Sequence, residues 1–436
     1  MKIHSITLAT KAKGLPAFLK RGRSLVNRYG LTPNKMDQAL QLLVQTLQRF
    51  DCAASIALTA VVLERNVGTI AKYIDQNIEF VVHGYTHIDY SQLSLEEQLE
   101  HLNRARKIFA AANIAVTGFR SPYLRQDVHL NMAIENSGFS YVCNQPVMWD
   151  VVDVDAFISS TCSSYERALG FYAPWSASER PSLPRLCGNL VEIPVSLPDD
   201  EILIDRLDGT TGDLVEQTWQ RILAETYQRG ELFTLQLHPE RMSLCLDGLS
   251  SVLTEARALT PSVWIARLDE IGAWWRARVE AQVDVRQADA ATWRLSVAGP
   301  SGVTILTRGV QVDEPTQLWD GGYRRAATMA VTVRSDRRPF IGVSTASPLT
   351  LGDFLRQQGY IIQVEEDDGR FSIYLDRPNF APENELAVLM EIENSNEPLI
   401  RLGRWPYGAR SALSVTGDID ALTLWDYVLR LCEGIV

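Results

Sequence analysis

The chain has 436 residues, of which 46% are hydrophobic and 22% are charged. This length predicts two or three domains, and the composition is typical of a soluble globular protein with a sizeable core. A formal net charge of −11 at pH 7 and a pI near 5.2 argue against nucleic acid or an anionic membrane as a partner.

Membrane insertion, export and a disulfide framework are also not expected. The sequence contains no run of 18 apolar residues, so no helix is predicted to span a bilayer. The N-terminal residues lack the apolar region of a signal peptide, which predicts a cytoplasmic location. The six cysteines are scattered and form no Cys-x-x-Cys pair, so we expect them to be reduced.

Residues 1–280 are predicted to alternate strands with helices. Strands are expected at residues 5–10, 54–59, 78–82, 116–119, 141–143, 191–195 and 232–237. Helices are expected at residues 32–50, 63–76, 94–112, 128–137, 212–227 and 266–279. Such alternation predicts a parallel sheet, open or closed into a barrel, whose chemistry lies at the carboxyl ends of the strands.

Residues 281–400 have a different texture. Segments rich in Val, Thr and Leu between residues 283 and 312 predict a small antiparallel β unit. A helix is expected at 347–358, then a hairpin whose Asp-Gly turn joins strands 360–365 and 370–375, then a strand at 385–392. No constellation of catalytic residues stands out here. We interpret the region as a structural bridge in preference to a carbohydrate-binding module.

Two histidines follow the apolar strand 78–82. His83 ends the strand and His87 comes four residues later, with Gly84 allowing a sharp turn between them. If the backbone coils after Val82, this spacing puts both imidazoles on one face, where they can hold one divalent ion. The alternative interpretation is a pair of surface histidines in a loop.

Two further strands run directly into polar residues. Strand 116–119 is followed by Arg120-Ser121-Pro122-Tyr123, and strand 232–237 is followed by His238. Taken singly, Arg120 is better explained by a loop salt bridge and His238 by a hydrogen-bonded histidine at the rim. Together with the histidine pair, on one face of a parallel sheet, they favour a functional site.

These residues carry a resemblance to a known family. In order and in strand context, they resemble the His-x-x-x-His, Arg-x-Pro-Tyr and Leu-x-His motifs of NodB-type polysaccharide deacetylases, carbohydrate esterase family four. Leu235 and Leu237 precede His238 in the last of these motifs, and residues 192–200 resemble the acidic segment that lines the family's groove. The resemblance covers roughly residues 25–280 and implies a distorted (β/α) barrel.

The family's first motif, a strand that ends in Asp-Asp or Asp-x-Asp, does not precede the histidines. It is found near the C-terminus, where the apolar strand 410–417 ends in Asp418-Ile419-Asp420. We interpret this order as a circular permutation that places the first strand and helix of the barrel at the C-terminus, with residues 22–31 following that helix in space. The alternative is a second, truncated deacetylase unit that begins at residue 410.

The expected architecture follows from this interpretation. It is an α/β fold, a distorted (β/α) barrel of the polysaccharide deacetylase type, circularly permuted, with an inserted β-rich unit. Residues 1–280 form the main part of the barrel, 281–400 a β-rich bridging domain, and 401–436 the C-terminal strand and helix that complete the barrel.

The resemblance also implies roles for the site residues. His83, His87 and Asp420 hold one divalent ion, most often zinc, with cobalt or nickel as alternatives. Asp418 is the general base, and Arg120 orients it.

The remaining roles concern the oxyanion, the leaving group and the acetyl methyl. The backbone N–H of Tyr123 helps to stabilise the oxyanion, and His238 protonates the leaving amine. Leu235 or Leu237 lines the pocket for the acetyl methyl.

The expected function is a metal-dependent hydrolase that removes N-acetyl or O-acetyl groups from a carbohydrate containing amino sugars. The expected partner is this carbohydrate, with no nucleic acid and no membrane span. Two alternatives stay open, namely hydrolysis of another amide or imide on the same barrel and an inactive carbohydrate-binding relative.

Overall fold

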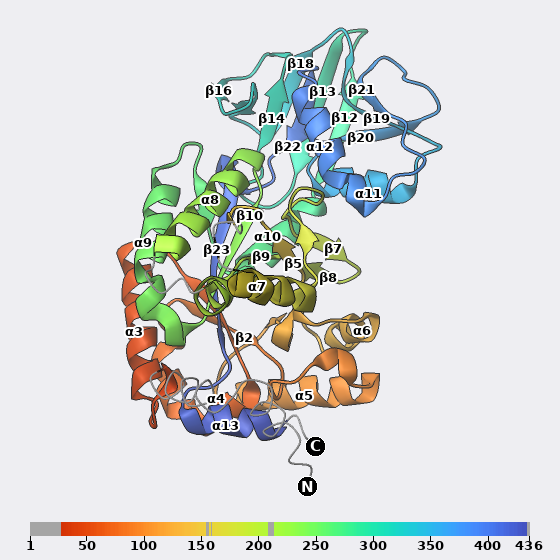
Figure 1. Cartoon of the computed structure of the whole chain (residues 1–436). Coiled ribbons are helices and arrows are strands. Elements are labelled where there is room, and N and C mark those ends of the chain that lie inside the picture. The colour runs from red at the N-terminus through yellow and green to blue at the C-terminus, as the bar shows by residue number, and fades with distance from the viewer. Residues whose placement is uncertain (1–27, 154–156, 158, 208–212, 434–436) are drawn as a thin grey trace.

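The computed structural model describes residues 28–153, 157, 159–207 and 213–433. The strand expected at residues 5–10 lies outside these residues. In the described part, a parallel sheet surrounded by helices occupies the larger part of the molecule, and a β-rich unit extends from one end of it (Figure 1). No helix within the described ranges is both long enough and apolar enough to cross a membrane.

The main sheet has the order β10-β23-β1-β2-β3-β4-β8-β7, with β11 also paired to β23. Its strands are β1 (Ala54–Leu58), β2 (Ile78–Val82), β3 (Gly118–Phe119), β4 (Tyr141–Val142), β7 (Arg185–Cys187), β8 (Leu190–Glu192), β10 (Leu232–Leu237), β11 (Val263–Ile265) and β23 (Ser411–Ile419). Every pair in this sheet is parallel except β7 with β8.

A second, three-stranded parallel sheet brings the structure close to closure. It has the order β6-β5-β9, with β5 (Pro146–Met148), β6 (Trp175–Ser176) and β9 (Val195–Leu197). Strand β9 lies against β10, at the far edge of the main sheet. The strands therefore form a distorted (β/α) barrel, as predicted.

Helices cover the outside of this barrel, because each presents one apolar face to the strands. They are α3 (Asn34–Arg49), α4 (Ala60–Ile70), α5 (Leu95–Ala111), α6 (Val128–Asn136), α7 (Ser159–Tyr172), α8 (Asp213–Arg229), α9 (Met242–Ala258), α10 (Leu268–Val279) and α13 (Leu424–Glu433). Of these, α7 and α9 were not expected from the sequence. The first expected helix begins at Asn34, two residues later than predicted, and Pro33 occupies its N-cap position.

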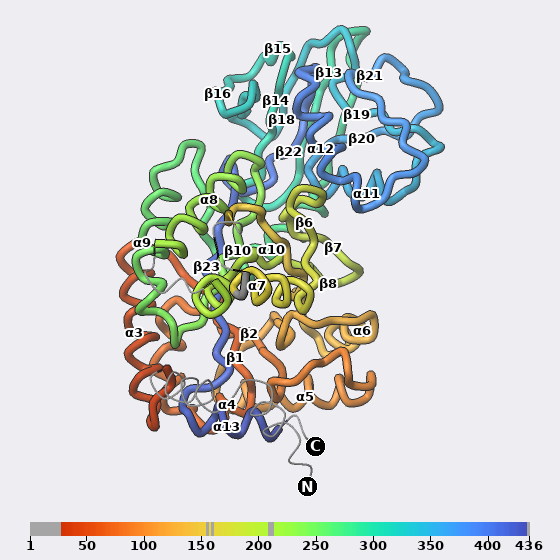
Figure 2. The backbone as a smooth tube through the Cα atoms, in the orientation of Figure 1, coloured from red at the N-terminus to blue at the C-terminus, as the bar shows by residue number. Residues whose placement is uncertain are grey.

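Strand β23 occupies a central position in the barrel although it comes from the C-terminal part of the chain (Figure 2). It pairs with β1 on one side and with β10 on the other. Gly417 permits this close packing, since a Cβ there would lie 3.0 Å from the backbone oxygen of Leu237. Helix α13 then lies beside α4, where Asn66 donates a hydrogen bond to Asp426 at 3.1 Å (Figure 1).

The β-rich unit contains three small sheets. Their orders are β12-β13-β18-β15, β16-β17-β14-β22 and β20-β19-β21. The strands are β12 (Gln282–Gln287), β13 (Thr292–Ala298), β14 (Ile305–Arg308), β15 (Gln311–Val312), β16 (Thr316–Leu318), β17 (Arg324–Ala326), β18 (Ala330–Arg334), β19 (Arg338–Ser344), β20 (Ile362–Glu365), β21 (Phe371–Leu375) and β22 (Leu399–Leu402). Two helices accompany them, α11 (Leu349–Gln357) and α12 (Glu385–Asn394).

Two local predictions in this unit are wrong. The predicted hairpin does not form, because β19 lies between β20 and β21 and pairs with both in parallel. Strand β19 is buried along nearly its whole length, so its central position outweighs the local Asp-Gly turn signal. The strand predicted at 385–392 is helix α12, because its buried residues Leu386, Leu389 and Ile392 recur every three positions.

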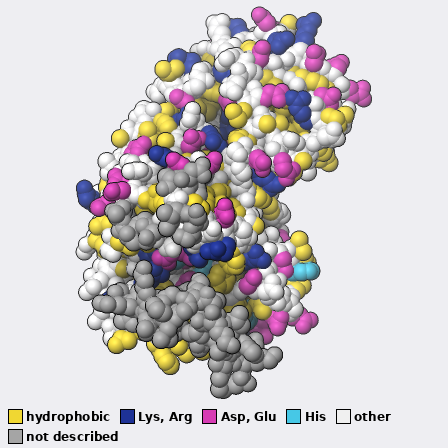
Figure 3. All heavy atoms as spheres, in the orientation of Figure 1, with side chains coloured by type: hydrophobic (Ala, Val, Ile, Leu, Met, Phe, Trp, Pro, Cys, Tyr) yellow, Lys and Arg dark blue, Asp and Glu magenta, His cyan; other side chains and the backbone are white. Residues whose placement is uncertain are grey.

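The barrel and the β-rich unit share an apolar core. Trp405, just before β23, packs at 5.6 Å between ring centroids against Trp275 of α10 and at 6.2 Å against Trp264 of β11. The same buried cluster includes Trp293 and Phe340 of the β-rich unit. On the face seen in Figure 3, acidic and basic side chains are interspersed over both units.

Candidate functional site

The candidate site lies at the carboxyl-end edge of the main sheet. The register aligns Leu58 with Val82 and with Ile419, so His83 and Asp420 extend from neighbouring levels of the sheet. Leu237 aligns with Gly417, which brings His238 to the same edge. Because parallel strands end on one side, segments distant in the sequence meet here.

His83, His87 and Asp420 form a group whose ligand atoms all lie within 4.8 Å of one another. The Nε2 atoms of His83 and His87 lie 3.4 and 3.2 Å from Oδ1 of Asp420. The chain does not coil into a helix between the histidines. Instead, Gly84 turns it with a φ of 81°, where a Cβ would lie 2.8 Å from the Tyr90 ring.

The geometry of this group fits one divalent ion. Tetrahedral zinc with bonds of about 2.0–2.1 Å separates its ligand atoms by roughly 3.3 Å, close to the two distances measured here. Oδ1 of Asp420 is buried and accepts no hydrogen bond from the described residues, although two imidazole nitrogens face it. An unsatisfied carboxylate oxygen between two nitrogens is the arrangement expected of a ligand set.

The surrounding groups favour the ligand forms of these side chains. Nδ1 of His83 lies 2.9 Å from the carbonyl oxygen of Arg120, which selects the tautomer whose Nε2 lone pair is free for a metal. Burial lowers the pKa of His87 to about 4, against the opposing effect of Asp420, so its imidazole is neutral. Burial opposes ionisation of Asp420, but the Arg430 guanidinium at 2.6 Å and His87 hold its pKa well below the usual range.

Asp418 is buried beside this group and accepts hydrogen bonds from two side chains. Nη1 of Arg120 donates to its Oδ1 at 2.8 Å, and Nε2 of Gln236 donates to its Oδ2 at 2.9 Å. Arg120 also donates to Thr416 and Cys143, both at 3.1 Å. Burial would raise the pKa of Asp418, but Arg120 and the nearby histidines lower it, so the carboxylate is ionised.

Arg120 is 1% exposed, which predicts a large effect on stability. We expect Arg120→Ala to lower the free energy of unfolding by about 3–5 kcal/mol, because Asp418 is left as a buried charge without a cation. Urea unfolding followed by circular dichroism measures this. The matched control is Arg125→Ala, whose 3.6 Å ion pair with Asp89 is partly exposed and contributes roughly 0–1 kcal/mol. Equal effects of the two substitutions would contradict the prediction.

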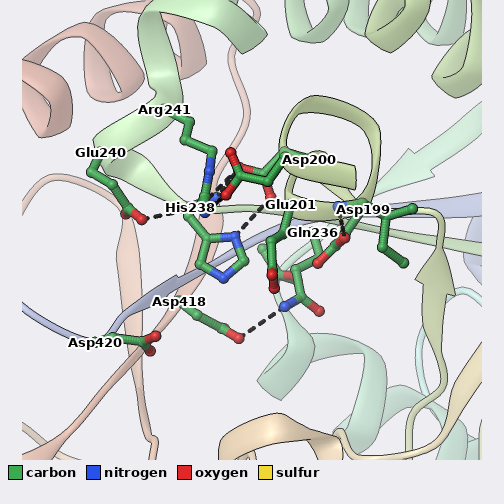
Figure 4. A network of polar contacts seen from close by, with 12 residues as sticks. Asp199, Asp200, Glu201, Gln236, His238, Glu240, Arg241, Asp418 and Asp420 are labelled. Carbon is green, nitrogen blue, oxygen red and sulfur yellow. Dashed lines mark hydrogen bonds and ion pairs between the residues drawn. The ribbon is translucent and has the colours of Figure 1, made fainter. Parts of the chain in front are cut away.

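His238 lies near Asp418 and against Asp200 (Figure 4). Its Nδ1 is 2.7 Å from Oδ1 of Asp200, and its backbone N–H donates to Oδ2 of Asp200 at 2.8 Å. Burial alone would lower the pKa of His238, but the Asp200 carboxylate raises it well above the ordinary value. The imidazole is thus held protonated, with Nε2 left for another partner.

Asp199, Asp200 and His238 form a second group with closely spaced ligand atoms. Here the ligand atoms already have hydrogen-bond partners, because both oxygens of Asp200 bond His238 and Oδ1 of Asp199 accepts the N–H of Ile202 at 2.9 Å. Burial and the Asp200 charge raise the pKa of Asp199 to about 7. This group is better explained as a support for His238 than as a metal site.

The remaining predicted residues are found in two environments. Tyr123 lies in the site, with its ring 4.5 Å from that of His87 and a backbone φ of 61°, a costly conformation for a residue with a side chain. Leu235 and Leu237 are fully buried in the barrel core. The structure therefore packs these two leucines among apolar neighbours.

Three site residues were not predicted as functional. Asp200 follows β9 and was included only within the acidic segment 192–200, Gln236 lies inside β10, and Arg430 lies on α13. A signal existed for Asp200, since two adjacent acids at the end of an apolar strand are unusual. For Gln236 and Arg430 the sequence offered no signal, because their partners Asp418 and Asp420 come from a different strand.

The comparisons with known proteins agree with the motifs. The family model "Polysaccharide deacetylase" matches residues 30–142. No curated protein matches the chain.

The solved structures that resemble this chain include the following three. A Mycobacterium smegmatis protein assigned to the polysaccharide deacetylases has 20% identity and a TM-score of 0.42, over 59% of this chain and 82% of that one. A family 4 carbohydrate esterase from Streptomyces lividans has 20% identity and a TM-score of 0.24, over 27% of this chain and 63% of that one. Puue allantoinase has 18% identity and a TM-score of 0.42, over 55% of this chain and 72% of that one. The resemblance to polysaccharide deacetylases that the motifs predicted is thus confirmed by the family model over residues 30–142, the part of the chain that carries His83, His87, Arg120 and Tyr123.

Proposed function

We propose that this protein is a metal-dependent hydrolase that removes N-acetyl or O-acetyl groups from a carbohydrate containing amino sugars. The observation that carries the proposal is the orphaned Oδ1 of Asp420, at 3.4 and 3.2 Å from two imidazole nitrogens. The family match over residues 30–142 supports the substrate class. Two nitrogens and a carboxylate suit zinc, with cobalt or nickel as alternatives.

The first chemical step is attack of water on the acetyl carbonyl. The divalent ion, when held by His83, His87 and Asp420, supplies Lewis acidity to the carbonyl and acidifies water. Asp418 takes the proton of the attacking water, since it is ionised and the charges of both His83 and His238 act on it. Arg120 and Gln236 fix its two oxygens, so the carboxylate is oriented before the substrate arrives.

The second step is departure of the sugar amine or alcohol. His238 donates a proton from Nε2 to the leaving nitrogen or oxygen, and Asp200 holds the imidazole protonated and in position. The backbone N–H of Tyr123 donates to the oxyanion, and the contact between the Tyr123 and His87 rings supports this role. The products are acetate and a free amine or hydroxyl.

We also propose that the barrel is circularly permuted, with β23 and α13 as its displaced first strand and helix. The parallel pairing of β23 between β10 and β1 supports this. So does the contact between α13 and the described residues that precede α3. The backbone N–H of Leu424 donates to the oxygen of Gly30 at 2.8 Å, and the rings of Tyr29 and Tyr427 lie 5.4 Å apart.

The test is acetate release by metal-free protein reconstituted separately with zinc, cobalt or nickel. Oligomers of N-acetylglucosamine and acetylated xylan are the carbohydrate substrates, and a hydantoin is the competing ring-amide substrate. We expect acetate release from a carbohydrate only after metal is added. Turnover of the hydantoin alone favours the other amide hydrolase, and metal binding without turnover favours a carbohydrate-binding relative.

A further inference from the structure

A second concave site lies at the other end of the barrel. A cavity of about 540 Å³ opens between the barrel and the β-rich unit. It is lined by the C-terminal end of α8, the turn between β16 and β17, helix α12 and the segment 401–410. That segment leads into the first residue of β23, whereas Asp418 and Asp420 follow its end, so about 30 Å of strand separates the two sites.

The cavity is lined by more arginines than carboxylates. The cations are Arg229, Arg401, Arg404 and Arg410, and the anions are Glu231, Asp320 and Glu393. Three of the arginines are paired. Arg410 forms an ion pair with Asp320, Arg401 with Glu393 at 2.5 Å, and Arg229 with Glu225 at 2.9 Å. Arg404 has no carboxylate within 4 Å among the described residues.

Arg404 is only 9% exposed, and its guanidinium is only partly bonded. Nη1 donates to the carbonyl oxygens of Arg229 at 2.9 Å and Gly230 at 3.5 Å, while the buried Nε has no hydrogen-bond partner within the described part of the chain. Capping the α8 carbonyls explains Nη1 and the neighbouring Arg410, which donates to Tyr227 at 2.7 Å. Capping leaves the buried Nε of Arg404 unexplained.

A second unpaired arginine lies behind Arg404. Arg278 of α10 is 1% exposed, and its Nε and Nη1 have no partner among the residues that the structure describes. Burial, Arg401 and Arg404 lower the pKa of Arg278 to about 9. Buried cations that outnumber their carboxylates leave a site of positive potential, which an anion entering the cavity would neutralise.

Apolar side chains also line the cavity. Helix α12 contributes Leu386, Leu389 and Met390, and the β16–β17 turn contributes Trp319. Cavities between units, of a few hundred Å³, with an apolar lining and a few converging polar groups, are typical small-molecule sites. We propose that this cavity binds a small organic anion whose phosphate or carboxylate group is held by Arg404 and whose body packs on Trp319 and Met390.

The test is calorimetric titration of the full chain with glucose 6-phosphate, glucuronate, inorganic phosphate and uncharged glucose. Using the Asp420→Ala variant as well as the wild type separates this cavity from the metal site. We expect saturable binding of at least one organic anion, of equal strength in both proteins, and none of glucose. Comparing glucose 6-phosphate with glucuronate distinguishes a phosphate from a carboxylate ligand.

Two variants place the binding site. Arg404→Gln removes the unpaired guanidinium, and Met390→Asp adds a negative charge at a cavity side chain that is 55% exposed and thus tolerant of change. Each is expected to weaken anion binding by roughly tenfold or more. The control is Met132→Asp on α6, at a side chain of similar exposure, 52%, outside the cavity lining. The proposal is overturned if no organic anion binds up to about 10 mM, or if Met390→Asp binds as tightly as the control.

Discussion

Replacing Asp420 by alanine is expected to leave a folded protein that no longer retains a divalent ion. The carboxylate supplies the only negative charge in the ligand group, and its removal leaves two imidazoles beside the Arg430 guanidinium. The unpaired cation then repels a metal ion that the carboxylate would have attracted. Loss of an outer partner alone costs 10–100-fold in metal affinity, so loss of this ligand should exceed about 100-fold. Acetate release should fall with the metal.

The measurement is metal per chain after dialysis against metal-free buffer, alongside circular dichroism. Asp420→Asn, which keeps the shape and removes the charge, is expected to behave similarly. Asp353→Ala serves as the control, because that carboxylate is on the surface of the β-rich unit and 68% exposed. If Asp420→Ala retains about one ion per chain, the ligand group is incorrect, and the proposed link between β23 and the histidines fails with it.

Replacing His238 by asparagine is expected to reduce the turnover number by roughly 10²–10⁴, the usual contribution of a general acid. Metal content should not change, because His238 bonds Asp200 and not the ligand group. A turnover number that stays near the wild-type value would exclude His238 as the proton donor.

Replacing Asp200 by asparagine tests whether the proton on His238 is needed, through the pH dependence of the activity. The Asp200 carboxylate raises the pKa of His238, so wild-type activity should persist to pH values well above 6.5. In Asp200→Asn the main influence that raises the pKa of His238 is gone, while burial and Arg241 still lower it, so we expect the pKa to fall to its ordinary value or below. At pH 8 a histidine with a pKa near 6.5 is about 3% protonated, so the rate should drop by roughly thirtyfold there.

The pH profile distinguishes this effect from a loss of orientation. In the variant, the alkaline limb should move to lower pH while the rate at pH 6 stays within a few-fold of the wild type. A uniform loss at every pH would mean that Asp200 positions the ring without setting its charge. The same ion pair affects stability, because a raised histidine pKa stabilises the fold below pH 6.5 and this contribution is lost as pH rises through the pKa in the folded protein.

The sequence predicted most of the residues that meet at the site, but fewer of the hydrogen bonds and ion pairs between them. Strand ends are visible in a sequence, and parallel pairing brings His83, Arg120, His238 and Asp418 to one edge. The Arg120–Asp418 pair was predictable, because a buried arginine needs a carboxylate. Which acid supports His238 was not predictable, since Asp200 reaches it from a strand of a different sheet.

The same limit explains the errors in the β-rich unit. A turn signal describes four residues, whereas the strand that separates β20 from β21 precedes both of them in the chain. Apolar residues in a short segment fit either period, so α12 was mistaken for a strand. In both cases the local sequence pattern was compatible with two structures, and contacts with distant parts of the chain determined which one formed.

The position of β23 has a consequence for how the protein is made. Arg120 and Asp418 are 298 positions apart, so a ribosome adding 5–20 residues per second synthesises Asp418 roughly 15–60 s after Arg120. During that interval the nascent chain carries β1, and later β10 as well, without the strand that pairs with both, and it carries the histidines without their carboxylate. Unpaired strand edges invite association with other chains. Newly made protein should therefore depend on chaperones until β23 enters the barrel, and metal can be loaded only after that.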